Sequence, residues 1–150
     1  MLTPSLTNWR AQYDRMRRSY ARVTGEYTSS VEYDDDLHHF VQDCWHLKDW
    51  IKNDPSAGVG KAIEAQALAY RSLQVVADLA NGSKHLDRHT HQVGAYVTST
   101  NVTVHLAQRR PANISYVVTL SDGSQTLAEA LVREAVQDWD TLLTKLGLLP

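Results

Sequence analysis

Two polar segments hold most of the side chains with potential for chemistry. The first, residues 78–86, combines the Asp78 carboxylate, the Asn81 amide, the Lys84 amine and the His85 imidazole. An imidazole with an unperturbed pKa of about 6.5 accepts a proton near neutral pH. A nearby ammonium group stabilises developing negative charge. This pairing suits metal-independent RNA cleavage, in which a base removes the ribose 2′-hydroxyl proton and a cation stabilises charge on phosphorus.

The second polar segment, residues 36–50, lies on a predicted helix with one apolar face. His39, Asp43 and His46 follow one another at steps of four and three residues, which places them on one side of a helix. If this helix neighbours the one that ends near residue 80, these side chains would face Lys84 and His85. We then expect Asp43 or Asp78 to orient the His85 imidazole.

The run Asn81-Gly82-Ser83-Lys84-His85 resembles the polar motif of HEPN domains, which are helical bundles of bacterial toxins, defence systems and RNA-processing proteins. In that motif an arginine, often followed by Asn or Asp, precedes a histidine by a few residues. Asn81 matches the polar residue and His85 the histidine, whereas Ala80 occupies the arginine position. The arginines nearby in sequence, Arg71 and Arg88, are not at the family spacing.

The resemblance covers roughly residues 5–90. It implies a helical fold and RNA cleavage by the motif histidine, usually at a dimer interface. We therefore expect RNA as the substrate, a homodimer, and a protein partner such as an antitoxin. The stretches HLKDWIKNDP and ADLANGSKHL also resemble uncharacterised bacterial and phage proteins of this helical type, a likeness that implies no known activity.

Other interpretations of the same residues stay open. Asn81-Gly82 is a common end of a helix because both residues tolerate positive φ, and Lys84 and His85 would then favour its negative end. A catalytically inactive binding module is the main alternative, with the arginines of the first helix contacting RNA or an acidic partner. The acidic residues 32–36 would also suit those arginines across a dimer interface.

A metal site in a helical bundle is a further alternative, since histidine and carboxylate ligands suit zinc or iron. The sequence contains no Glu-x-x-His or His-Glu-x-x-His motif. We therefore assign no metal ligands and expect no cofactor. The residues that would form such a site are His85, His89 and His91 in one cluster, and His38, His39, Asp43 and His46 in the other.

Four segments have helical periodicity. The first is expected to begin at Thr3 and Pro4 and to end at Gly25, with its apolar face on residues 6–23. The second should start after the acidic residues 34–36 and stop at residues 53–55, because proline does not extend a helix. A third runs from about Lys61 to Ala80, with a break near residues 70–72. The last follows a Thr126–Glu129 capping box.

Between the third and last helices the period changes. Residues 96–98, 102–104 and 113–120 are expected to form short strands, and residues 121–124 a tight turn. The sequence thus predicts one α+β domain over residues 1–150, mainly α: a four- or five-helix bundle with a small antiparallel β insert at about 92–126, before the C-terminal helix.

Composition limits the remaining possibilities. A 150-residue chain with 43% hydrophobic and 21% charged residues has the balance of a globular protein. A net charge of −2 gives no general basic field for nucleic acid. Cys44 is the single cysteine, so no disulfide forms within the chain. No apolar run approaches the roughly 18 residues of a membrane span. Without a signal-like start, we expect a cytoplasmic protein and no membrane contact.

Overall fold

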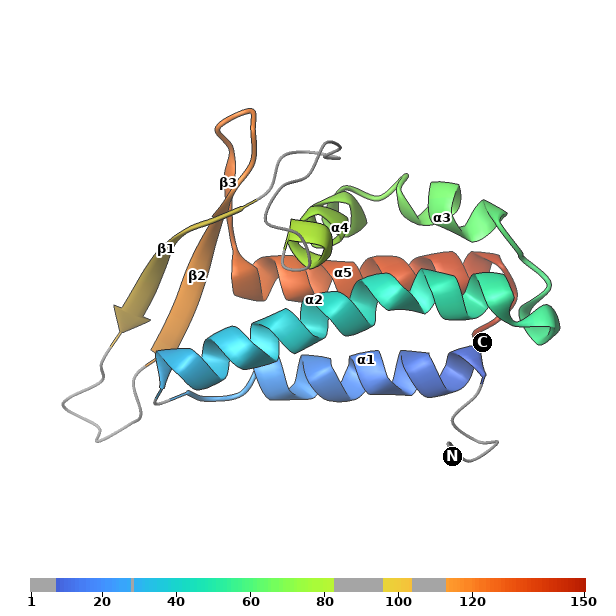
Figure 1. The fold of residues 1–150 in the computed structure, drawn as a ribbon, viewed down its shortest axis with the longest axis horizontal. Helices are drawn as coiled ribbons and strands as arrows, with labels where there is room; N and C mark the ends of the chain where they lie inside the picture. Colours follow the sequence, from blue (N-terminus) through green and yellow to red (C-terminus); the bar gives the residue numbers. More distant parts are fainter. Residues whose placement is uncertain (1–7, 28, 83–95, 104–112) are drawn as a thin grey trace.

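The computed structural model describes residues 8–27, 29–82, 96–103 and 113–150, most of which are helical (Figure 1). This confirms the predicted fold class, mainly helical with a small antiparallel sheet before the C-terminal helix. In chain order the elements are α1 (Trp9–Val23), α2 (Ser30–Asn53), the 3-10 helix η2 (Pro55–Ala57), α3 (Ala62–Ala67), α4 (Arg71–Gly82), β1 (Tyr96–Thr103), β2 (Asn113–Thr119), β3 (Gln125–Leu127) and α5 (Ala128–Lys145).

The three longest helices, α1, α2 and α5, lie side by side (Figure 1). α1 and α2 form an antiparallel hairpin, and α3 and α4 lie on the side of α2 away from α1. The sheet stands at one end of the helices, near the starts of α2 and α5. Arg10 at the start of α1 donates to the Leu148 carbonyl at 3.3 Å, which ties the beginning of the helical body to its end.

The apolar faces predicted for the helices meet in one core. On α2 the buried positions run from Tyr33 to Ile51 and form the apolar face that was predicted for this helix. Trp139 of α5 is fully buried against them, and its indole Nε1–H donates to the Cys44 carbonyl at 3.1 Å. Because a buried indole N–H needs an acceptor, this bond fixes the position of α5 along α2.

The first two helices begin at residues other than those predicted. α1 begins at Trp9 rather than at Pro4, because Asn8 is extended and its side chain caps the helix by accepting from the Ala11 N–H at 3.0 Å. α2 begins at Ser30, before the acidic run, with Ser29 as its cap. The end of α2 at Asn53 was predicted correctly, and Pro55 opens η2.

The predicted break in the third helical segment is present. α3 ends at Ala67 and α4 begins at Arg71, with a turn at residues 68–70 between them. Gln74 donates to the Leu68 carbonyl at 2.7 Å, which satisfies one of the carbonyls at the end of α3.

The sheet has the antiparallel order β1-β2-β3. The two strands predicted at 96–98 and 102–104 are one strand, β1, with an irregular register between Val97 and Ser99. The tight turn was predicted correctly, and Gly123 takes the positive φ that it needs. The capping box was wrong: Thr126 pairs with Val118 in the sheet, and α5 starts after Leu127 without a side-chain cap.

Candidate functional site

The end of α4 lies against the middle of α2. Gln42 of α2 donates through Nε2 to the Ala80 carbonyl at 2.7 Å. Asn81, the next residue, is half-buried, and Asp78 is 2% exposed. His46, half-buried, follows Gln42 by one helical turn. The two helices that carry the predicted polar segments are therefore neighbours. Lys84 and His85 lie outside the described residues, so their grouping with α2 stays a prediction.

Asp43 takes part in a row of polar contacts between α1 and α2, here called the polar seam and formed by Gln12, Ser19 and Asp43. The Ser19 hydroxyl donates to the Asp43 carboxylate, and Gln12 donates through Nε2 to the Asp43 carbonyl at 2.9 Å. Arg22 donates to the Ser19 hydroxyl at 2.9 Å. Because its described partner is on α1, the Asp43 carboxylate points toward α1. Sequence periodicity placed Asp43 on a helix face with His39, which is exposed.

Several arginines proposed as a binding stripe have partners within the chain. Arg22 lies 3.8 Å from Asp36, and Arg17 lies 3.5 Å from Asp140. Arg71, one of the arginines near the motif, instead forms an ion pair of 3.2 Å with Asp122 in the β2–β3 turn. These pairs are largely exposed, so each contributes little to stability but reduces the local positive charge.

The histidines and the cysteine give limited chemistry in the described part of the chain. No three His, Cys, Asp or Glu residues there are grouped so as to hold a metal ion. The predicted cluster of His85, His89 and His91 lies outside that part. Cys44 is fully buried, and burial raises the pKa of its thiol well above the usual range, so the thiol stays protonated and unreactive.

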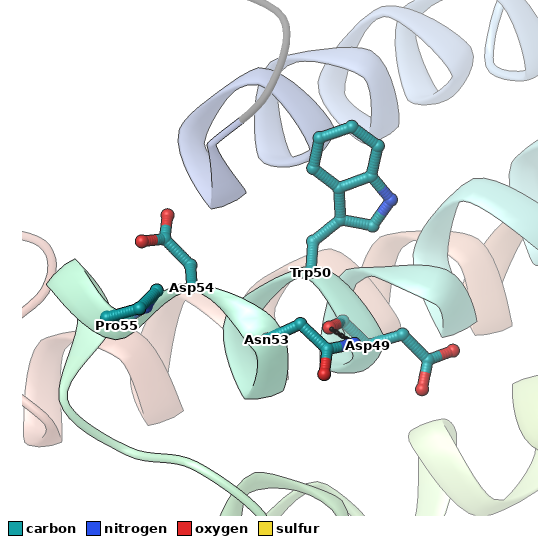
Figure 2. Close-up of a pocket in the computed structure, with 5 residues that line it drawn as sticks. All are labelled: Asp49, Trp50, Asn53, Asp54 and Pro55. Carbon is teal, nitrogen blue, oxygen red and sulfur yellow. Dashed lines mark hydrogen bonds between the residues drawn. The ribbon is translucent and has the colours of Figure 1, made fainter.

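A surface pocket of about 310 Å³ opens where α2 ends, lined by Asp49, Trp50, Asn53, Asp54 and Pro55. Figure 2 shows the Trp50 indole and the Asp54 side chain extending toward α1, whereas the Asp49 side chain points away from the indole ring. The Asn53 side chain folds back onto the helix and donates through Nδ2 to the Asp49 carbonyl at 2.9 Å.

Asp54 is held in place by donors from two elements. Its Oδ2 accepts from the Trp9 backbone N–H at 3.0 Å, and its Oδ1 accepts from the Ser56 hydroxyl at 2.6 Å and the Ser56 N–H at 2.9 Å. The bond from the Ser56 hydroxyl, followed by that from the Trp9 N–H, lowers the pKa of Asp54. The carboxylate is therefore charged at neutral pH and joins the end of α2 to the start of α1.

The sequence prediction missed this pocket. Residues 53–55 were interpreted only as a helix stop, and residues 36–50 only as a polar segment on a helix with one apolar face. The available signal was an Asp-Pro step that follows a tryptophan by one helical turn, but Trp9 approaches Asp54 across 45 residues of sequence. Local patterns do not predict such a contact.

Comparisons with known proteins add no relative. No protein-family model matches the chain, and neither the curated proteins nor the solved structures contain a significant match. Within the ranges that the structure describes, no helix has both the length and the apolar character needed to cross a membrane.

Proposed function

We propose that this chain is a HEPN-like protein that cleaves single-stranded RNA without a metal ion, as a ribonuclease of the toxin or defence type. His85 is the general base and Lys84 the cation, with Asn81, Asp78 and His46 as the polar groups around them, whereas the Asp43 carboxylate bonds to Ser19 on the α1 side of α2. The observation that supports this proposal is the Gln42–Ala80 hydrogen bond, which puts the end of α4 beside the turn of α2 that carries Gln42 and His46.

Chain connectivity also supports the proposal. His85 follows the last residue of α4, Gly82, by three positions. Three extended residues span at most about 11 Å, so covalent connectivity limits the distance between the Cα atoms of Gly82 and His85 to that value. In the reaction, His85 takes the 2′-hydroxyl proton, the 2′-oxygen bonds to phosphorus, and the P–O5′ bond breaks. The leaving oxygen takes a proton from solvent, which yields a 2′,3′-cyclic phosphate and a 5′-hydroxyl.

The test is cleavage of end-labelled single-stranded RNA in EDTA. Replacing a general base lowers the rate by about 10²–10⁴-fold, so His85→Ala should abolish visible cleavage. His89→Ala is the matched control and should retain activity. Lys84→Arg should keep more activity than Lys84→Gln, because the cation is retained. Intact RNA after long incubation with the wild-type protein, or equal cleavage by His85→Ala, would contradict the proposal.

A second candidate is an interaction module without catalysis, favoured by Ala80. The residue at the family's arginine position is 1% exposed, and its carbonyl accepts from Gln42. Under this candidate the protein binds RNA or a protein such as an antitoxin and leaves RNA intact. We further propose a homodimer in the cytoplasm for either function. Light scattering at micromolar concentration that shows only monomer would reject the dimer.

A further inference from the structure

The pocket at the end of α2 combines an aromatic ring with carboxylates. Trp50 is half-buried, and the Arg15 guanidinium carbon lies 5.8 Å from the centre of its ring. That distance is within the range of a cation–π contact. The ring is thus already in an environment that attracts a guanidinium group.

Asp54 contributes a negative charge to the pocket. None of the described hydrogen-bond donors to its carboxylate is a cation. The three described donors to Asp54 are all neutral: the N–H groups of Trp9 and Ser56 and the Ser56 hydroxyl. The lowered pKa of Asp54 keeps it ionised. The pocket lies at the carbonyl end of α2, where the helix dipole favours positive charge, and Asp54 also faces the positive end of α1 through the Trp9 N–H.

Asp49 supplies the second carboxylate on the pocket wall. Its Oδ1 accepts from the Lys48 ammonium at 2.7 Å, and its side chain remains 45% exposed. A cation entering the pocket can therefore approach this carboxylate from solvent. An anionic group such as a phosphate would meet both Asp49 and Asp54, so the charge of the pocket disfavours it.

We propose that this pocket binds an arginine side chain of a partner polypeptide. A guanidinium group is planar, carries five N–H donors and stacks on aromatic rings while it donates to carboxylates. An ammonium group has the same charge but not the flat face. A pocket of about 310 Å³ also suits one side chain rather than a large ligand. This inference does not depend on RNA cleavage.

The test is a titration of the folded protein with short blocked peptides, followed by NMR of the tryptophan indole and backbone amide signals. The probe is Ac-Gly-Arg-Gly-NH2, with Ac-Gly-Lys-Gly-NH2 as the comparison of equal charge. We expect the arginine peptide to shift the Trp50 indole signal and the amides of residues 49–56. The lysine peptide should bind at least about threefold more weakly than the arginine peptide.

Two variants, one control variant and one further ligand make the test decisive. Asp49→Asn should weaken the arginine peptide about threefold. Asp35→Asn is the control, because it removes the same charge from an exposed position elsewhere on α2. Trp50→Leu should also weaken binding. Free arginine has the same net charge as the blocked peptide, because its α-ammonium offsets its α-carboxylate, so it should bind no more tightly than the peptide.

The proposal is overturned if no signal of residues 49–56 shifts. It is equally overturned if the lysine peptide binds as well, or if Asp35→Asn weakens binding as much as Asp49→Asn. Tighter binding of free arginine would assign the pocket to a small molecule and not to a polypeptide. Because peptide binding is measured without RNA, its failure is separate from a failure of the ribonuclease proposal.

Discussion

Replacing Ser19 with alanine tests whether the polar seam holds α1 against α2. Ser19 is fully buried, and its hydroxyl donates to the Asp43 carboxylate while it accepts from Arg22. A hydrogen bond to a charged group contributes about 1.5–3 kcal/mol. The Arg22 contact is on the exposed side and adds at most about 0.5 kcal/mol. Since Asp43 is only half-buried, we expect Ser19→Ala to lower the free energy of unfolding by about 2 kcal/mol.

The assays are urea unfolding and thermal unfolding, both monitored by far-UV circular dichroism. In a chain of this length, each kcal/mol corresponds to about 2–4 °C in Tm, so Tm should fall by about 4–8 °C. Ser124→Ala is the matched control, because its hydroxyl also donates to a carboxylate, Asp122, but in an exposed turn. The control should change stability by less than about 0.5 kcal/mol. Equal losses in the two variants would refute the reasoning.

Three further perturbations test other contacts. Trp139→Phe removes the donor to the Cys44 carbonyl and leaves a small cavity, so the free energy of unfolding should fall by about 2 kcal/mol in urea titrations; an unchanged midpoint would contradict this. Gly58→Ala should cost about 1 kcal/mol because φ is +69° there, whereas Gly82→Ala, at a position without positive φ, should cost nothing. Asp54 has a pKa lowered below its unfolded value, so its contribution to stability is present above about pH 4 and is lost as pH falls through the folded pKa. When unfolding is measured between about pH 6 and about pH 2, the free energy of unfolding should therefore fall more steeply for the wild type than for Asp54→Asn. Parallel curves for the two proteins would count against this role of Asp54.

Helix interiors were predictable from the sequence. The spacing of apolar residues on α2 matches the buried positions because a helix turns every 3.6 residues, whatever its neighbours. The end of α2 at Asn53 was also predictable from local sequence, since Pro55 has no N–H to donate.

Helix starts were less predictable because several residues compete to cap. Asn8 and Ser29 cap α1 and α2, although Thr3 and the acidic run were equally plausible from composition. The predicted capping box failed because pairing of Thr126 with Val118 satisfies the backbone in another way. A local preference of about 1 kcal/mol is easily outweighed by such pairing.

Only part of the candidate site could be predicted from the sequence. Periodicity correctly placed Asp43 and His46 on one helix and Asp78 on another, whereas Asn81, expected just after that helix, lies within α4. It did not show that Asp43 bonds to Ser19, because that contact depends on which helix lies next to α2.

The amino-acid sequence by itself determined the mainly helical class, the core-facing stripes and the segments that carry polar chemistry, since these follow from local periodicity and residue type. Tertiary structure alone decided which polar groups meet. Ser19 reaches Asp43, Gln42 reaches Ala80, and the Trp9 N–H reaches Asp54. The physical reason is that such contacts form only when burial of the apolar faces has set the positions of whole helices, and no short stretch of chain contains that information.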